Sequence, residues 1–228
     1  MPTPAPLDPL PRLVVFDMDG TLCDTTQIIV DTWHATLIEC GFGSPGHDAI
    51  RHYVGSAIKA SFPALRPDSA PGDIDVFMSH YRDNYIAAVT RSHPPLFLGV
   101  REILDRLFEA GTLLGVATSK SRVGLDRTLD ALDLRRYFVA FATADQAPSK
   151  PHPQMMLDLL RDTRTDPQDA IMIGDTTFDL EMAHHAGVRA VGVTWGAHSR
   201  ETLVKVKPFA VVDGLSDLLR ERGPPSPR

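Results

Sequence analysis

The sequence has few cysteines and no long hydrophobic run. Its 228 residues include only Cys23 and Cys40. These are too few and too close for a disulfide framework, and they lack the spacing of a structural zinc site. The longest apolar run near the start, residues 13–16, is far shorter than a signal-peptide core or the roughly 20 residues that span a bilayer. We therefore expect a cytoplasmic protein with reduced thiols, no export signal and no membrane anchor.

The sequence also lacks an excess of basic residues and any long block of like charge. Lys and Arg number 23 against 29 Asp and Glu, which gives a formal net charge of −6. Because a nucleic-acid binder needs clustered Lys and Arg to contact phosphates, we expect no nucleic-acid partner and infer a small-molecule one. The composition, 43% hydrophobic and 23% charged, excludes disordered, collagenous and coiled-coil chains.

Short β-branched runs alternate with longer segments of helical period. This alternation is typical of an α/β fold in which a parallel sheet is flanked by helices on both faces. The predicted strands are Arg12–Asp17, Leu113–Thr118, Phe138–Thr143, Ala170–Gly174 and Ala190–Thr194, with Ala210–Val212 as a possible sixth. Between them we predict helices over residues 100–108 and 176–187 and a short turn after Asp166.

One long stretch breaks this alternation. Residues 25–92 contain no convincing strand, yet they hold two faces of helical period: Ile29, Trp33, Leu37 and Cys40, and Ile74, Phe77, Tyr81 and Tyr85. We therefore predict a helical cap domain at 25–92, inserted into a core domain of residues 1–24 and 93–228. The proline-rich ends, 1–11 and 221–228, are expected to be flexible tails. The insert would overhang the carboxyl ends of the strands, where open parallel sheets bind ligands.

Polar clusters follow the predicted strands. They are Asp17-Met18-Asp19-Gly20-Thr21, Thr118-Ser119-Lys120, Ser149-Lys150-Pro151, and Gly174-Asp175 with Thr176-Thr177-Phe178-Asp179. If the first strand is central, three of these strand ends are neighbours, and each pair of carboxylates at about 4 Å costs on the order of 4 kcal/mol at an effective dielectric near 20. A divalent cation would relieve this repulsion, and oxygen ligands favour Mg²⁺.

The ammonium of Lys150 beside such a metal would suit a phosphate dianion. Asp17, which ends its strand, is then a candidate nucleophile for phosphorus. Asp19 would donate a proton to the leaving oxygen and recover it from the attacking water. Thr118 and the backbone N–H groups of Gly20 and Thr21 would hold phosphoryl oxygens, with Ser119 beside them, and Lys150 would neutralise charge in the transition state.

With these motifs in this order, the chain resembles the haloacid dehalogenase-like phosphatases, in particular the phosphoglycolate phosphatase group with a helical cap. The resemblance covers most of the chain and implies a Rossmann-like core. It matches Asp17 and Asp19 to the family's nucleophile and acid/base, and Thr118 and Lys150 to its phosphate-binding residues. It implies that Mg²⁺ is held by the Asp17 side chain, the Asp19 backbone carbonyl and Asp175, with Asp179 completing the site by orienting water or Lys150.

Several of these residues have simpler interpretations. Lys150 alone is typical of a solvated surface lysine, Thr118 of a residue that caps a following helix, and Asp179 of an exposed acid near a helix N-terminus. Lys120 and Arg122 either contact substrate or cap and solvate the helix that begins beside them.

The main functional hypothesis is a Mg²⁺-dependent phosphatase acting on a small phosphorylated metabolite through an aspartyl phosphate on Asp17. The resemblance suggests 2-phosphoglycolate or a similar ester, with specificity set by the cap. A sugar phosphomutase or pyrophosphatase on the same scaffold, and a non-catalytic module that binds a phosphate ligand or a protein, are alternatives. The oligomeric state is left open.

Overall fold

The structure is a computed structural model that describes residues 6–43 and 45–219. Its centre is a six-stranded, fully parallel sheet in the order β3-β2-β1-β4-β5-β6. The strands are β1 (Leu13–Phe16), β2 (Leu113–Thr118), β3 (Ala140–Thr143), β4 (Ala170–Gly174), β5 (Arg189–Val193) and β6 (Ala210–Val212). The predicted α/β class is confirmed, and β1 pairs with both β2 and β4, so the polar segments that follow these three strands start from adjacent positions.

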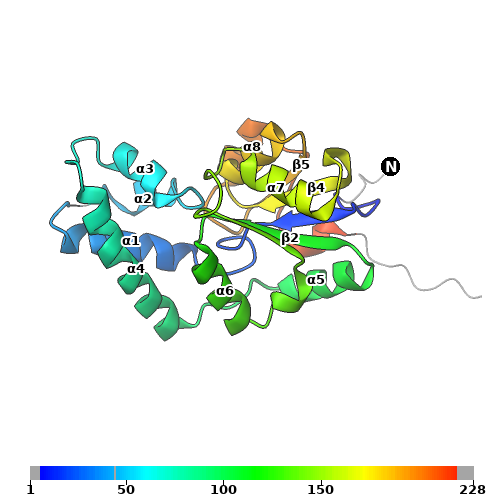
Figure 1. Ribbon diagram of the computed structural model, residues 1–228, viewed down its shortest axis with the longest axis horizontal. Helices are drawn as coiled ribbons and strands as arrows, with labels where there is room; N and C mark the ends of the chain where they lie inside the picture. The colour runs from blue at the N-terminus through cyan, green and yellow to red at the C-terminus, as the bar shows by residue number, and fades with distance from the viewer. Residues whose placement is uncertain (1–5, 44, 220–228) are drawn as a thin grey trace, which may run out of the picture.

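Helices cover both faces of this sheet. The helices outside residues 25–92 are α5 (Val100–Glu109), α6 (Arg122–Ala131), α7 (Gln154–Thr163), α8 (Thr177–His185) and α9 (Arg200–Leu203). Figure 1 shows α5 and α6 on one face of the sheet and α7 and α8 on the other. Two buried clusters result, because strand side chains alternate between the faces. One cluster includes Val14 and Phe16 with Leu104 of α5, and the other includes Val15 with Leu159 of α7.

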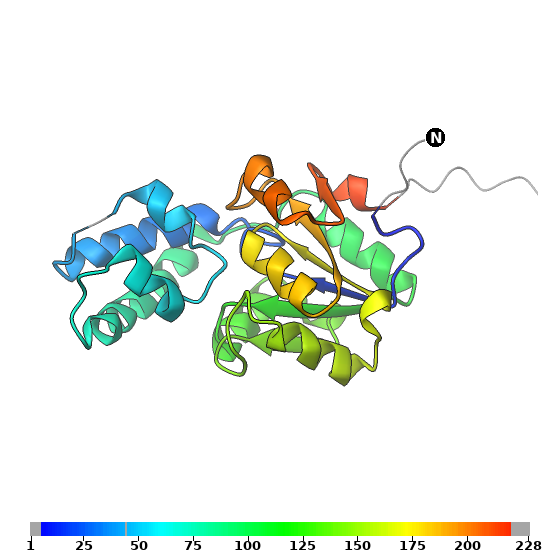
Figure 2. The ribbon, with the colours of Figure 1, turned by 90° about the horizontal axis from the view of Figure 1, so that it is seen from above.

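The second part of the molecule lies to one side of the sheet. Its helices are α1 (Thr26–Glu39), α2 (His47–Arg51), α3 (Ile58–Leu65) and α4 (Asp73–Ser92), and we call them together the helical unit. Figure 2 shows it beyond one end of the strands. It has its own buried cluster, in which the rings of Trp33, Phe62 and Phe77 pack with Tyr81. Both predicted faces of helical period supply this cluster.

Several predicted boundaries need correction. The first strand omits Arg12 and Asp17, and the fifth runs over 189–193. The third begins at Ala140 rather than Phe138, because a 3₁₀ turn at Arg135–Tyr137 takes up the N–H of Phe138. The helix predicted over 176–187 is α8, which Thr176 caps. The turn expected after Asp166 is present as the 3₁₀ segment Pro167–Asp169.

The ends of the chain differ in part from the expected tails. Leu7, within the predicted tail 1–11, is buried, and its N–H donates to the carbonyl of Leu218 in the 3₁₀ segment Leu215–Leu218. An apolar side chain that packs in the main cluster does not belong to a flexible segment. Residues 1–5 and 221–228, the remainder of the predicted tails, lie outside the described residues. None of the described helices combines the length and the apolar character that a membrane crossing requires.

Candidate active site

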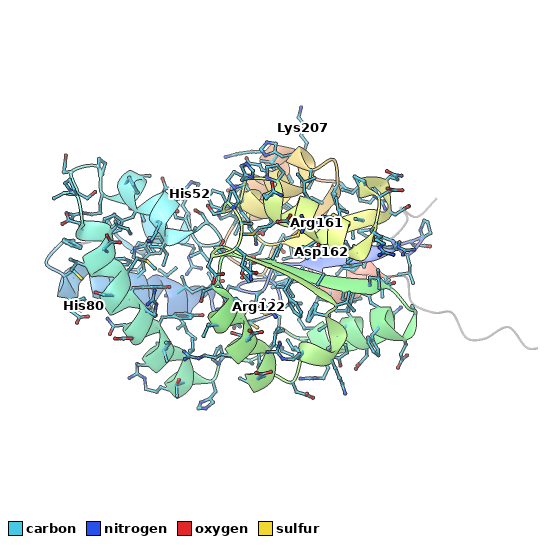
Figure 3. The ribbon with its side chains drawn as sticks, in the orientation of Figure 1. His52, His80, Arg122, Arg161, Asp162 and Lys207 are labelled. Carbon is cyan, nitrogen blue, oxygen red and sulfur yellow. The ribbon has the colours of Figure 1, made fainter. Side chains whose placement is uncertain are left out.

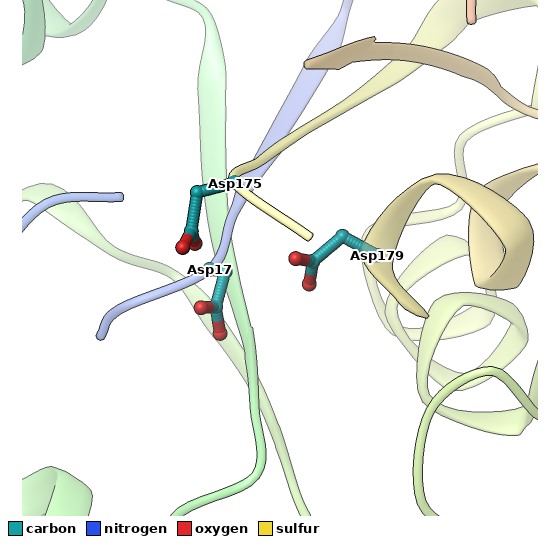
Figure 4. Close-up of side chains that lie close together, drawn as sticks. All are labelled: Asp17, Asp175 and Asp179. Atoms are coloured by element: carbon teal, nitrogen blue, oxygen red, sulfur yellow. The ribbon is translucent and has the colours of Figure 1, made fainter. Parts of the chain in front are cut away.

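Three carboxylates converge at the carboxyl ends of the central strands. Asp17 directly follows β1, Asp175 directly follows β4, and Asp179 lies in the first turn of α8. One carboxylate oxygen from each lies within 4.8 Å of the other two, and all three side chains are buried (Figure 4). Parallel pairing of β1 with β4 brings Asp17 and Asp175 together, and the turn from β4 into α8 places Asp179 beside them.

Lys150 lies against two of the three carboxylates of this acidic cluster. Its Nζ donates to Asp17 Oδ1 and to Asp179 Oδ1, each at 2.6 Å, and its side chain is completely buried. The interpretation of Lys150 as a solvated surface lysine is therefore wrong. Burial by itself lowers the pKa of this lysine, but the two carboxylates more than offset that effect and hold the pKa above its ordinary value.

Three carboxyl groups share one ammonium in this cluster. Burial raises the pKa of Asp17 well above its ordinary value; Lys150 opposes this, and the carboxylates of Asp179 and Asp175 reinforce it. Burial, with Asp179 beside it, likewise raises the pKa of Asp175 to about 7. Both shifts have the same physical cause, because ionised carboxylates in a buried site repel one another and lose water.

Asp175 is held from two sides by separate parts of the chain. The Thr21 hydroxyl donates to its Oδ1 at 2.8 Å, and the backbone N–H of Ala197 donates to its Oδ2 at 2.8 Å. Gly20, at φ +82°, and Gly196 lie so close that a Cβ at either position would collide with the Asp175 carboxylate. The absence of side chains there lets two backbone segments enclose this carboxylate.

Asp179 uses both of its carboxylate oxygens within the protein. Oδ1 accepts from Lys150, while Oδ2 accepts from the backbone N–H and the hydroxyl of Thr176. Thr176 and Asp179 thereby form a capping box at the start of α8. The interpretation of Asp179 as an exposed helix acid is wrong, because its side chain is fully buried. Its contacts suit the support of Lys150 better than direct contact with a ligand.

Asp19 lies at the edge of the cluster, with 14% of its side chain exposed. The hydroxyl of Thr25 donates to its Oδ1 at 2.7 Å, and Lys120 Nζ lies 2.9 Å from the same oxygen. Lys120 also donates to the hydroxyl of Tyr85 in α4 at 2.9 Å. Burial lowers the pKa of Lys120, but Asp19 and then Tyr85 raise it above the ordinary value. Of the two sequence interpretations of Lys120, solvation is wrong.

The other two predicted phosphate-binding side chains, Thr118 and Ser119, make different contacts in the structure. Thr118 is buried at the end of β2, and its hydroxyl accepts from the N–H of Lys120 at 3.2 Å. It does not cap α6, whose N-cap is Ser121. Ser119 donates instead to the carbonyl of Gly55 in the helical unit at 2.6 Å.

The turn after β1 also differs from its predicted role. The N–H of Gly20 donates to the carbonyl of Cys23 at 2.9 Å, and the Thr21 side chain is used by Asp175. The Gly20 N–H is therefore not available to a phosphoryl oxygen, contrary to the sequence prediction. Gly20 and the Thr21 hydroxyl pack against Asp175, while the contact of the Thr21 N–H with a phosphoryl oxygen stays a prediction.

Sequence reasoning missed several residues around this cluster. Gly55 and His52 reach it from the helical unit, and Gly196 and Ala197 reach it from the loop after β5. His198, in that loop, accepts at Nδ1 from the N–H of Thr177 and contacts the His52 carbonyl through Nε2, and Figure 3 shows His52 beside the core. The loop after β5 follows the carboxyl end of a strand, and that position alone was a signal.

The residues present fit a divalent cation. Asp17 Oδ2 is buried and has no hydrogen-bond partner among the described residues, although Oδ1 of the same carboxylate is bonded to Lys150. An unpartnered buried carboxylate oxygen is costly unless a cation neutralises it. Asp17, Asp175 and Asp179 form the only cluster of metal-ligating side chains found in 6–43 and 45–219, and hard oxygen donors are the ligands of Mg²⁺.

Comparison with known proteins places this geometry in a family. Residues 14–193, which include the whole cluster, match the family model described as haloacid dehalogenase-like hydrolase. The chain belongs to this family. The resemblance seen in its motifs is thereby confirmed, and the chain is a hydrolase.

Two curated relatives cover nearly the whole hydrolase. A phosphoglycolate phosphatase from Agrobacterium fabrum is 34% identical over 220 residues, which cover 92% of this chain and 91% of the relative. A pyrophosphatase from Bacillus pumilus is 30% identical over 207 residues, which cover 90% of this chain and 94% of the relative. Both alignments extend through the helical unit as well as the sheet.

Solved structures agree on the fold of the hydrolase. The crystal structure of a predicted phosphatase from Clostridium acetobutylicum superposes with a TM-score of 0.82 at 27% identity, covering 92% of this chain and 96% of the other. The crystal structure of a haloacid dehalogenase-like hydrolase from Bacteroides fragilis superposes with a TM-score of 0.80 at 24% identity, covering 91% of this chain and 99% of the other, and shows the likeness of fold alone. The Rossmann-like core expected from the sequence is confirmed.

Proposed function

We propose that this hydrolase is a Mg²⁺-dependent phosphatase that cleaves a small phosphomonoester through an aspartyl phosphate on Asp17. The observation that carries the proposal is the environment of this carboxylate. It directly follows a central strand, contacts Lys150, lies beside Asp175, and has one buried oxygen without a partner in the described chain. A carboxylate surrounded in this way is suited to attack a phosphorus atom that a cation holds in place.

The metal would be held by the Asp17 side chain, the Asp19 backbone carbonyl and Asp175. When bound, Mg²⁺ would neutralise the phosphoryl oxygens and the ligating carboxylates. Thr21 and Ala197 already hold the Asp175 carboxylate in place for this role. Asp179, whose Oδ1 accepts from the Lys150 ammonium at 2.6 Å, would act by holding Lys150 beside Asp17.

The reaction takes two steps on this chain's own residues. First, an oxygen of Asp17 forms a bond to phosphorus while the bond to the leaving oxygen breaks, and the Asp19 carboxyl gives its proton to that oxygen. Next, water attacks the aspartyl phosphate, Asp19 takes a proton from this water, and inorganic phosphate leaves with Asp17 restored.

The phosphoryl group would be bound by Lys150 and Thr118. Lys150 brings a buried positive charge beside the reacting carboxylate, where it stabilises charge that grows on the phosphoryl oxygens. Thr118 receives the N–H of Lys120 at its oxygen, which leaves its own proton for a phosphoryl oxygen.

The helical unit would serve as a cap over this site. In the part of the chain that the structure describes, three hydrogen bonds join it to the core: from Ser119 to the Gly55 carbonyl, from Lys120 to the Tyr85 hydroxyl, and between His198 and the His52 carbonyl. All three surround the strand ends that carry Asp17 and Asp175. A lid in this place would exclude water and select the leaving group.

The relatives suggest which substrates to examine first. The Agrobacterium fabrum relative is named a phosphoglycolate phosphatase and the Bacillus pumilus relative a pyrophosphatase. We propose a small phosphomonoester such as 2-phosphoglycolate as the substrate and pyrophosphate as the second candidate, because both alignments cover about nine-tenths of the chain and the phosphoglycolate phosphatase is the more similar, at 34% identity against 30%.

A phosphate-release assay tests this proposal. Purified protein with Mg²⁺ is expected to release phosphate from at least one compound in a panel of 2-phosphoglycolate, pyrophosphate, sugar phosphates and aryl phosphates. Asp17→Asn should reduce the rate by at least about 10³-fold, because it removes the nucleophile. No release from any compound, or full activity in Asp17→Asn, would exclude the proposal. Isomerised sugar phosphate without free phosphate would instead indicate a phosphomutase.

A further inference from the structure

Among the described residues, the hydrogen bond and the ion pair of the Asp19 carboxylate both involve Oδ1. Thr25 donates to Oδ1 and the Lys120 ammonium lies against Oδ1, and neither contact uses Oδ2. Two contacts on one oxygen fix the rotation of the carboxyl group. The side chain keeps 14% of its surface exposed, so the second oxygen is open to contact with a ligand.

Lys120 is itself fixed from the helical unit. Its side chain is only 9% exposed, its Nζ donates to the Tyr85 hydroxyl at 2.9 Å, and the ammonium lies 4.9 Å from the centre of the Tyr85 ring. A flexible lysine that reaches across a junction needs such partners, because its free side chain samples many rotamers.

The position of Tyr85 is set by the aromatic cluster of the helical unit. Its ring stacks on Tyr81 with centroids 5.9 Å apart, and Tyr81 stacks on Phe77 at 5.5 Å. Phe77 is fully buried beside Trp33. A row of rings along α4 therefore connects the core of the helical unit to the ammonium that contacts Asp19.

We propose that Lys120 and Tyr85 are positioning residues for the acid/base Asp19, so that the helical unit orients Asp19 Oδ2 toward the leaving oxygen. This inference rests on the proposed phosphatase function. It assigns Lys120 to the orientation of Asp19 rather than to a contact with the phosphoryl group. Substitution of Lys120 or Tyr85 would leave Asp17, Asp175 and Asp179 in place and disturb proton donation by Asp19 alone.

Proton donation matters unequally among substrates, which gives a specific readout. A 4-nitrophenolate leaves without a proton, whereas an alkoxide requires one. The ratio kcat/KM reports the steps up to formation of the aspartyl phosphate, so the later hydrolysis of that common intermediate does not affect it. Loss of general acid positioning should therefore reduce kcat/KM for an alkyl phosphate and spare 4-nitrophenyl phosphate.

The experiment compares these two substrates in a set of variants. Lys120→Met is expected to reduce kcat/KM for the alkyl phosphate by about tenfold or more, and for 4-nitrophenyl phosphate by less than about threefold. Tyr85→Phe, which keeps the ring and removes the hydroxyl, should act in the same direction with a smaller effect. Lys120→Arg should restore part of the alkyl phosphate activity.

Tyr81→Phe is the matched control, since it changes a neighbouring tyrosine of the same helix and keeps the stacked ring. It should leave the ratio of the two kcat/KM values as in the wild type. Magnesium binding by calorimetry and the circular dichroism spectrum should be unchanged in Lys120→Met, as they report the Asp17 cluster and the fold.

Two outcomes would contradict the positioning role, and they differ in what they imply for the phosphatase function. If the wild type hydrolyses both esters and Lys120→Met reduces both equally, or neither, the positioning role is wrong while the phosphatase function stands. If the wild type hydrolyses no ester at all, both the function and this inference are overturned.

Discussion

The two parts of the molecule are stabilised in different ways. The sheet buries charge, since Asp17, Asp175, Asp179 and Lys150 are all enclosed at the strand ends. The described part of the helical unit buries aromatic rings, and its buried polar residues are only Thr and Ser. At the junction the unit offers the sheet neutral groups: two backbone carbonyls and a tyrosine hydroxyl.

This difference suggests that the sheet carries the reacting groups and that the helical unit controls the entry of the ligand. Buried charges need a rigid frame, because a buried charge that is separated from its partner is strongly destabilising. A hydrogen bond between neutral groups contributes about 1 kcal/mol, and one that involves a charged group, such as the bond from the Lys120 ammonium to Tyr85, about 1.5 to 3 kcal/mol. A junction made of such single hydrogen bonds opens at modest cost. The sheet is thus suited to hold the reacting groups, and the helical unit to admit and enclose a ligand.

The largest expected effect tests the charged part of this comparison. Lys150→Met leaves Asp17 and Asp179 without their ammonium and should lower the free energy of unfolding by about 3 to 5 kcal/mol, with loss of phosphate release. Lys205→Met, at an exposed lysine, is the control and should change stability by less than about 0.5 kcal/mol. Urea unfolding measures both. Equal stability of the two variants would show that the contacts of Lys150 with Asp17 and Asp179 do not stabilise the fold.

Metal binding should affect the same region with a smaller magnitude. Mg²⁺ at about 100 times its Kd should stabilise the wild type by about 2.7 kcal/mol relative to EDTA. Asp175→Asn should abolish most of this gain, because it removes a ligating charge. Asp213→Asn changes an exposed acid that is paired with Arg200 and should keep the gain. Thermal unfolding with and without Mg²⁺ provides the measurement, and an unchanged response in Asp175→Asn would contradict the metal site.

Alanine substitutions at two glycines of the helical unit distinguish the effect of backbone strain from the effect of impaired docking of this unit on the sheet. Gly55 (φ +92°) and Gly43 (φ +67°) both have positive φ, but a Cβ at Gly55 would lie 2.7 Å from Thr176 whereas one at Gly43 meets open space. Both alanine variants should lose about 1 kcal/mol of stability from strain. Only Gly55→Ala should also lower kcat/KM, by roughly tenfold, which corresponds to about 1.4 kcal/mol. Steady-state kinetics measure this effect, and equal kinetics in the two variants would mean that Gly55 does not dock the helical unit.

The smallest effect concerns a single hydrogen bond of the junction. Ser119→Ala removes the donor to the Gly55 carbonyl and should weaken docking by about 1 kcal/mol or less. The expected result is a several-fold rise in KM with little change in stability. Ser119→Thr keeps the hydroxyl and should restore the wild-type KM. A large fall in kcat instead would support the sequence prediction that Ser119 contacts the phosphoryl group.

Local pattern explains why much of the core could be predicted. The runs 113–118 and 170–174 are continuous and apolar because both faces of these strands are buried, and both bounds are confirmed. Asp17 and Asp175 directly follow such runs, so their common location at one sheet edge followed from parallel pairing. The burial of Lys150 did not follow, because nothing local distinguishes it from a surface lysine.

The sequence by itself determined the α/β class, the helical insert and the acids at the strand ends, because hydrophobic period and position along a strand are local properties. Tertiary structure alone decided which groups hold those acids. Ala197 reaches Asp175 from the loop after β5, and Lys120 reaches Asp19 while being held by Tyr85 of α4. These contacts join segments distant in the chain, and they exist only once the sheet order and the docking of the helical unit are established.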